Sequence, residues 1–212
     1  MTSAFRFGCV GILLLAGCSG RTKNYRFSDE QLAWQGYRLG EVLRFTQSPT
    51  GPVRTYRVTN VNDRMERVFF FNVLPFSPPK IECQQITVWV QRTDTVAYEA
   101  TALELRFETQ QGQQPYPAFA SLGWDAPYRT TYFPLKELTQ GLPFDTLFYP
   151  NVRLLASARL GSAVYAPVIR ADQPYSASPS STPGRTRVLY YARAKGLVAF
   201  EEAGTGLWYR LP

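Results

Sequence analysis

Two stretches of the chain alternate strictly between apolar and polar residues. Every second residue is apolar between Gln85 and Gln91, and again between Leu103 and Glu108. A period of two places the apolar side chains on one face of a β-strand and the polar ones on the other. Because a short segment containing Thr93-Asp94 separates the stretches, we expect an antiparallel hairpin here.

Weaker patterns indicate further elements before this hairpin. Strands are expected over 42–45, 53–61 and 68–75, with a turn over 60–64 that contains Asn62-Asp63. A brief helical turn is expected within 31–39, with Ser28 as its N-cap.

The pattern fades between Pro115 and Asn151, where prolines and aromatic residues accumulate. We interpret this part as a long ordered excursion with a helical turn at Leu135–Leu138. A second hairpin is expected about Gly161-Ser162, followed by a Ser- and Pro-rich surface loop over 173–184.

Three short strands are expected at the end of the chain, over 187–193, 196–201 and 207–211. Their close spacing predicts a meander that can close a sheet. The prediction is therefore an all-β fold: a single antiparallel domain over 24–212 with a curved, half-barrel-like sheet.

The first residues have the features of a secretion signal. Arg6 gives a short positive region, and the apolar run over 10–15 is too short to cross a bilayer as a mature helix. We therefore expect a signal peptide over 1–17.

The four residues Leu15-Ala16-Gly17-Cys18 resemble the lipobox of bacterial lipoproteins. The resemblance implies cleavage between Gly17 and Cys18 and attachment of acyl chains to Cys18, which anchor the mature chain to a lipid bilayer. Residues 18–23 would then be a lipidated N-terminus and tether.

The residues after Cys18 bear on localisation. Ser19 is not the Asp that retains similar lipoproteins in the inner membrane, and 20–24 lack the acidic cluster that accompanies surface export in the Bacteroidota. The resemblance thus favours the periplasmic face of the outer membrane, with surface exposure as the alternative.

A second resemblance lies near the C-terminus. The run from Leu189 to Glu201, followed by Gly206-Leu207-Trp208, resembles an ending of uncharacterised β-rich lipoproteins of the Bacteroidota. It supports the expected fold and compartment but implies no activity.

The charge does not indicate nucleic-acid binding. The 23 basic and 16 acidic residues give +7, and loss of Arg6 with the signal leaves 22 against 16, or +6. The basic residues are scattered singly rather than clustered, so no nucleic-acid partner is expected.

Few catalytic constellations fit this composition. The chain has no histidine, which removes Ser-His-Asp and Cys-His catalysis as well as imidazole metal sites. Of its three cysteines, Cys9 would leave with the signal and Cys18 would carry lipid. Cys83 would remain as a thiol buried in the core, with a reactive thiol or dimer formation as the alternative. No metal or cofactor is predicted.

Carboxylates are the remaining acid–base candidates, and they leave a glycan hydrolase as an alternative. Glu104 and Glu108 lie four positions apart on one expected strand, roughly 13 Å at the rise of a strand, which is long for a glycosidase pair. Glu201-Glu202 and Asp125 offer no better pair, so we interpret these acids as a solvated surface.

The aromatic residues of the central third are the strongest indication of function. Trp89, Trp124, Tyr128 and Tyr132 are candidates for ligand-facing side chains on a concave sheet. Core packing is the competing interpretation. We therefore expect a non-enzymatic lipoprotein that binds an envelope lipid, a glycan or a protein. The alternatives are the hydrolase and a structural component of a surface-exposed complex.

Overall fold

The computed structural model describes residues 22–68, 81–94, 101–111, 114–124, 130–145, 147–172 and 186–212. Strands dominate and two short helices accompany them, as the all-β prediction requires. In chain order the elements are β1 (Lys23–Tyr25), α1 (Asp29–Leu32), β2 (Val42–Thr46), β3 (Val53–Val68), β4 (Ile81–Arg92), β5 (Thr101–Gln111), β6 (Gln114–Trp124), β7 (Thr130–Pro134), α2 (Leu135–Gln140), β8 (Val152–Leu155), β9 (Ala158–Leu160), β10 (Ala163–Tyr165), β11 (Val168–Asp172), β12 (Thr186–Ala192), β13 (Gly196–Glu202) and β14 (Gly206–Arg210).

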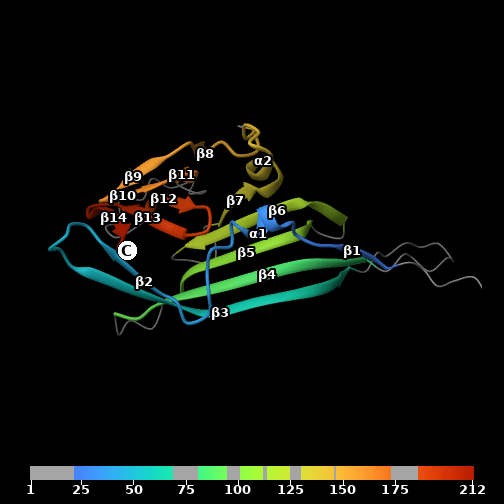
Figure 1. Cartoon of the computed structure of the whole chain (residues 1–212), viewed down its shortest axis with the longest axis horizontal. Coiled ribbons are helices and arrows are strands. Elements are labelled where there is room, and N and C mark those ends of the chain that lie inside the picture. Colours follow the sequence, from blue (N-terminus) through green and yellow to red (C-terminus); the bar gives the residue numbers. More distant parts are fainter. Residues whose placement is uncertain are drawn as a thin grey trace, which may run out of the picture.

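One sheet contains twelve of these strands (Figure 1). Its order is β7-β6-β5-β4-β3-β2-β14-β13-β12-β11-β8, and β1 adds to β4 as a parallel partner. All other pairs are antiparallel. The sheet curls into a nearly closed barrel whose unsealed seam lies between its two end strands, β7 and β8. The predicted curved, antiparallel sheet is therefore confirmed.

The inner face of this sheet carries the main core. The apolar sides of β4 and β5 meet there, with Val88 opposite Leu105 and Ile86 opposite Phe107. These side chains are buried, whereas the alternate residues point to the outer face. The hairpin prediction holds because the two strands share the same period and therefore the same buried side.

The predicted turn at Asn60–Arg64 is wrong. β3 continues as a sixteen-residue strand through these positions, and Asn62 and Asp63 pair with Thr87 and Ile86 of β4. A register shift between Val58 and Asn60 marks a local irregularity instead of a reversal. The long ladder with β4 outweighs the local turn preference of Asn and Asp, because strand propensity depends on the pairing partner.

The predicted excursion over 115–151 is wrong for its first half. Residues 114–124 and 130–134 form β6 and β7, which extend the sheet beyond β5. The expected helical turn at Leu135–Leu138 is confirmed as α2, and Leu135 and Leu138 are both buried in the main core.

A second, smaller core lies on the outer face of β11–β14. The β9–β10 hairpin, which turns at the predicted Gly161-Ser162, contributes Leu160 and Tyr165 to it. β8 and β11 continue the same antiparallel register, with Leu155 opposite Val168, so the two strands expected on either side of this turn are confirmed, with an interruption at 156–157 and 166–167. Gly161 lets the hairpin pack closely against Tyr209 of β14, since a Cβ at residue 161 would lie 2.4 Å from the ring of Tyr209.

The predicted C-terminal meander is confirmed as β12–β14. The N-cap of α1 is the expected Ser28, which forms a capping box with Gln31. Two hydrogen bonds attach the segment after α1 to the meander. The hydroxyl of Tyr191 donates a hydrogen bond of 2.5 Å to the carbonyl of Trp34. The hydroxyl of Tyr37 accepts one of 2.8 Å from the amide of Leu197.

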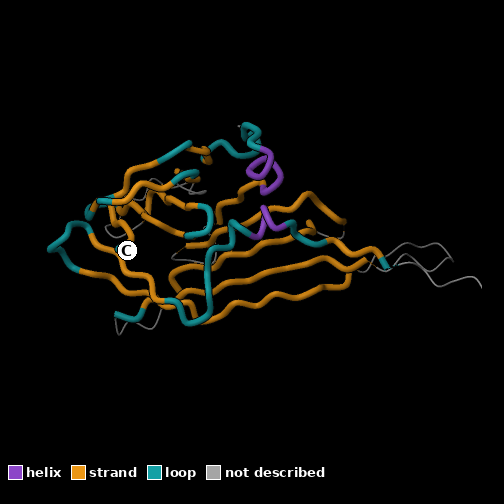
Figure 2. Tube along the Cα trace, in the orientation of Figure 1, coloured by secondary structure: helices purple, strands orange, loops and turns teal. Residues whose placement is uncertain are grey.

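The Cα trace shows how little of the described chain is helical (Figure 2). Neither described helix is long and apolar enough to cross a membrane. The predicted strand over 68–75 and the loop over 173–184 lie outside the described residues, apart from Val68 at the end of β3.

Candidate functional site

The predicted lipidation site lies outside the described residues, as do Gly17 and the signal peptide. Acylation at Cys18 stays a prediction. The described chain begins at Thr22, immediately before β1, and β1 pairs with the first residues of β4.

Cys83 is buried, as predicted. Its side chain is 2% exposed and packs with Ile81 and Tyr25 where β1 meets β4. Burial raises the pKa of the Cys83 thiol, because the thiolate would lose its hydration. This environment suits packing better than nucleophilic chemistry.

Trp89 lies on the outer face of the sheet, away from the main core. It stands between Asn60 of β3 and Glu104 of β5, and it is 45% exposed. Its indole N–H donates to Glu104 Oε1 at 3.4 Å, and Arg106 Nε donates to the same oxygen at 2.7 Å. The indole is therefore held beside a carboxylate and a guanidinium while part of it faces solvent.

A second set of polar contacts crosses the same face. Arg64 Nη2 donates to Gln85 Oε1 at 2.9 Å, and Gln85 Nε2 donates to Glu108 Oε1 at 2.7 Å. The contacts thus join β3, β4 and β5. We call Arg64, Gln85, Trp89, Glu104, Arg106 and Glu108 the outer polar face.

The other predicted aromatics are not gathered around Trp89. Tyr132 is 49% exposed and contacts the ring of Phe119, with centroids 6.1 Å apart. It lies on β7, three strands from Trp89, or about 14 Å at the usual spacing of strands. Trp124 ends β6, and Tyr128 lies outside the described residues.

Trp89 and Tyr132 are on the outer face, so neither lines the concave face that the sequence suggested. Tyr132 stands opposite Ser121, whereas its neighbour Phe133 stands opposite Ala120 and is buried in the main core. Ligand binding by Trp89 and Tyr132 stays a prediction, and it would take place on the outer face of the sheet.

The described candidate carboxylates lie on two strands, β5 and β13, and their interpretation as a solvated surface is wrong for Glu202, which is buried. Glu104 and Glu108 project from one strand with Arg106 between them. Glu201 accepts a hydrogen bond from Tyr190 on the outer side, whereas Glu202 is directed toward Arg54 on the inner side. Asp125 lies outside the described residues. Among those that are described, no group of three or more potential metal ligands occurs.

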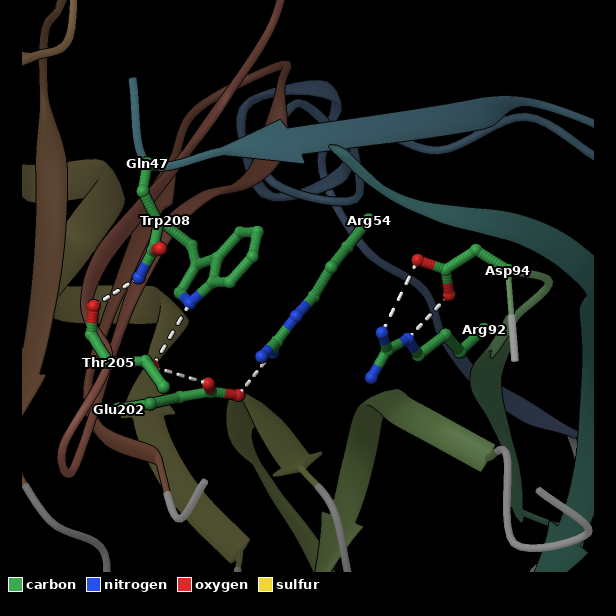
Figure 3. A network of polar contacts seen from close by, with 7 residues as sticks. All are labelled: Gln47, Arg54, Arg92, Asp94, Glu202, Thr205 and Trp208. Atoms are coloured by element: carbon green, nitrogen blue, oxygen red, sulfur yellow. Dashed lines mark hydrogen bonds and ion pairs between the residues drawn. The ribbon is translucent and has the colours of Figure 1, made fainter. Parts of the chain in front are cut away.

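A partly buried polar cluster, which the sequence did not predict, joins the region of β2 and β3 to that of β13 and β14 (Figure 3). Arg54 of β3 forms an ion pair with Glu202 of β13 at 2.5 Å, with the two side chains 16% and 5% exposed. The Arg54 guanidinium also lies 3.9 Å from the centroid of the Trp208 ring. A partly desolvated cation above an indole is stabilised by roughly 1–2 kcal/mol.

The remaining contacts complete the hydrogen bonding of this cluster. Thr205 donates to Glu202 Oε2 at 2.8 Å and accepts from Trp208 Nε1 at 3.2 Å. Gln47 donates to the carbonyl of Thr205. Because both charges and the indole N–H have partners inside the chain, we interpret the cluster as a structural connection between β2–β3 and β13–β14.

The chain was compared with protein-family models, with curated proteins and with solved structures, and none of the three comparisons found a match.

Proposed function

We propose that this protein is a lipid-anchored binding protein of the bacterial envelope, and that its outer polar face recognises a glycan. The observation that carries the proposal is the partly exposed Trp89, whose indole N–H is fixed by Glu104. An aromatic side chain held in place offers an apolar surface at a low entropic cost, and the apolar side of a sugar ring can lie against it.

The residues around Trp89 supply the polar half of such a site. Arg106 is about half-exposed, and Glu104 and Glu108 are partly exposed on the same strand. Their carboxylates and guanidinium can accept from and donate to sugar hydroxyls. Since they already form hydrogen bonds to one another, they are oriented before a ligand arrives, which lowers the cost of binding.

The proposed lipid anchor would determine where the outer polar face is located. Acylation of Cys18, implied by Leu15-Ala16-Gly17-Cys18, would keep the outer polar face near the membrane and, at the periplasmic side of the outer membrane, near envelope polysaccharides. Metabolic labelling with a palmitate analogue tests this part: the unchanged chain should incorporate the label and the Cys18→Ser variant should not.

The glycan part is tested by titrating soluble peptidoglycan fragments into the purified protein and measuring Kd by calorimetry. We expect Trp89→Ala to raise Kd at least tenfold, which corresponds to about 1.4 kcal/mol. Glu104→Gln, which keeps the shape of the side chain but removes its charge, should weaken binding less.

Phe148→Ala is the matched control, because Phe148 is 73% exposed but lies between α2 and β8, away from the outer polar face. Equal binding by the Trp89 and Phe148 variants would contradict the proposed site.

A further inference from the structure

The seam of the barrel leaves two strand edges without partners in the described chain. β7 is paired with β6 only, and β8 with β11 only. α2 and the loop after it connect the two strands (Figure 1), but no backbone hydrogen bond is found between β7 and β8. Such edges offer alternating N–H and C=O groups to an additional strand.

A second observation places an unmet polar group beside this seam. Thr131 of β7 is 5% exposed, and its hydroxyl is the one buried side-chain polar atom in the described residues that lacks a hydrogen-bond partner. A buried polar group without a partner is unfavourable, so its presence is informative. Thr109, by contrast, donates to the carbonyl of Gln84 at 3.2 Å.

The register shows to which side Thr131 points. Thr131 stands opposite Leu122 and Phe133 opposite Ala120, and all four side chains are buried. Thr130 and Tyr132, which alternate with them, belong to the outer side. The unmet hydroxyl is therefore on the inner side of an edge strand, where the next strand of the sheet would place a side chain.

We propose that the seam binds an extended peptide from a partner protein, which adds to β7 as a further strand. The backbone of the peptide would pair with the free edge, the mode known as β-augmentation. Opposite Thr131 the peptide would carry a Ser, Thr or Asn, because hydroxyl pairs across strands form hydrogen bonds. An acyl chain would satisfy neither the edge nor the hydroxyl.

The lengths of β7 and β8 limit the length of the peptide that can pair with them. β7 has five residues and β8 has four, so about five residues of the peptide can pair. Its inward residues other than the one opposite Thr131 should be apolar, since Phe133 and Leu135 border that side and are almost completely buried.

The test uses random seven-residue peptides displayed on phage and selected on the full protein without its lipid. We expect the selected peptides to alternate between apolar and polar residues and to slow amide hydrogen exchange at Thr130–Phe133. Thr131→Val should weaken their binding at least tenfold, whereas Thr131→Ser should retain it. Thr130→Val, the same change on the outer side of β7, should have no effect.

A stability measurement provides an independent readout. Thr131→Val should raise the midpoint of thermal unfolding of the free protein, because it removes a polar group without a partner, whereas Thr109→Val should lower it. A lower midpoint for Thr131→Val would show that the hydroxyl already has a partner and would overturn the proposal. Peptides that bind Thr131→Val unchanged, or protection of β7 by palmitate and by no peptide, would overturn it too.

Discussion

The ring of Tyr37 occupies the space that a side chain at residue 196 would need. A Cβ built on Gly196 would lie 2.4 Å from Tyr37 Cζ, and the backbone of Gly196 has a φ of +71°. The same tyrosine hydroxyl accepts the hydrogen bond from Leu197. The glycine in the C-terminal meander thus serves both its own turn and the attachment of the segment that precedes β2.

Gly196→Ala should therefore destabilise the protein strongly. The substitution combines the strain of a left-handed residue, about 1–2 kcal/mol, with the overlap against Tyr37. Urea unfolding should show a loss above about 2 kcal/mol. Gly206→Ala is the control, because Gly206 has a φ of +86° but no atom within 4 Å of its built Cβ. Equal losses would mean that Tyr37 does not restrict this position.

The two members of the Arg54–Glu202 pair should not be equally costly to remove. Arg54→Met leaves a carboxylate that is 5% exposed with only Thr205 as partner, and we expect a loss of about 3 kcal/mol. Glu202→Leu should cost less, because Arg54 is more exposed and keeps its contact with Trp208.

The double variant Arg54→Met/Glu202→Leu should recover most of the stability lost in Arg54→Met, since a paired replacement leaves no charge buried alone. Chemical unfolding of all four proteins gives the coupling energy. Losses that simply add would contradict a direct interaction.

Alkaline pH should weaken the fold through its buried tyrosines. Burial, assisted by the carboxylate of Glu201, raises the pKa of Tyr190 to about 12. A tyrosine with a raised pKa contributes stability that is complete below its unfolded value of about 10 and is lost as the pH rises through the folded value. Burial also raises the pKa of Tyr37 and Tyr191.

The free energy of unfolding should thus fall between about pH 10 and pH 12. Tyr190→Phe should reduce that fall, and Glu201→Gln should lower the pKa of Tyr190 in an absorbance titration of tyrosinate. A titration that is unchanged by Glu201→Gln would exclude the carboxylate as a cause.

Cys83 should resist thiol reagents in the folded protein. Because Cys83 is 2% exposed and burial raises its pKa, a Cys9→Ser/Cys18→Ser chain, in which Cys83 is the remaining thiol, should react with a chromogenic disulfide only after urea is added. Fast reaction without urea would show that the contact between β1 and β4 opens in solution.

The sequence predicted the elements in which local preference and final pairing agree. The alternation around Val88 and Leu105, and the closely spaced C-terminal strands, are of this kind. β6 was missed because Pro115, Ser121 and Gly123 have weak strand preference, and it forms by pairing with β5 and β7. The turn expected at Asn62-Asp63 failed for the same reason.

The sites depend still more on tertiary pairing. The partial exposure of Trp89 could not be predicted, but its place on the polar side of an alternating strand was visible in the sequence. Arg54 and Glu202 are 148 residues apart, and the order of strands that joins them had no local signal. The unmet hydroxyl of Thr131 was equally hidden, since it depends on which strand ends the sheet.

The pairing of β14 with β2 has a consequence for how the chain assembles. The ladder pairs Tyr209 with Thr46 and Arg210 with Phe45, and the amide of Leu211 donates to the carbonyl of Arg44 at 2.8 Å, so β14 completes the edge of β2 through a short contact. During synthesis the edge of β2 stays open until β14 has emerged. A chaperone that covers this edge would protect the chain from aggregation in that interval, and a chain truncated before β14 would leave the edge of β2 exposed.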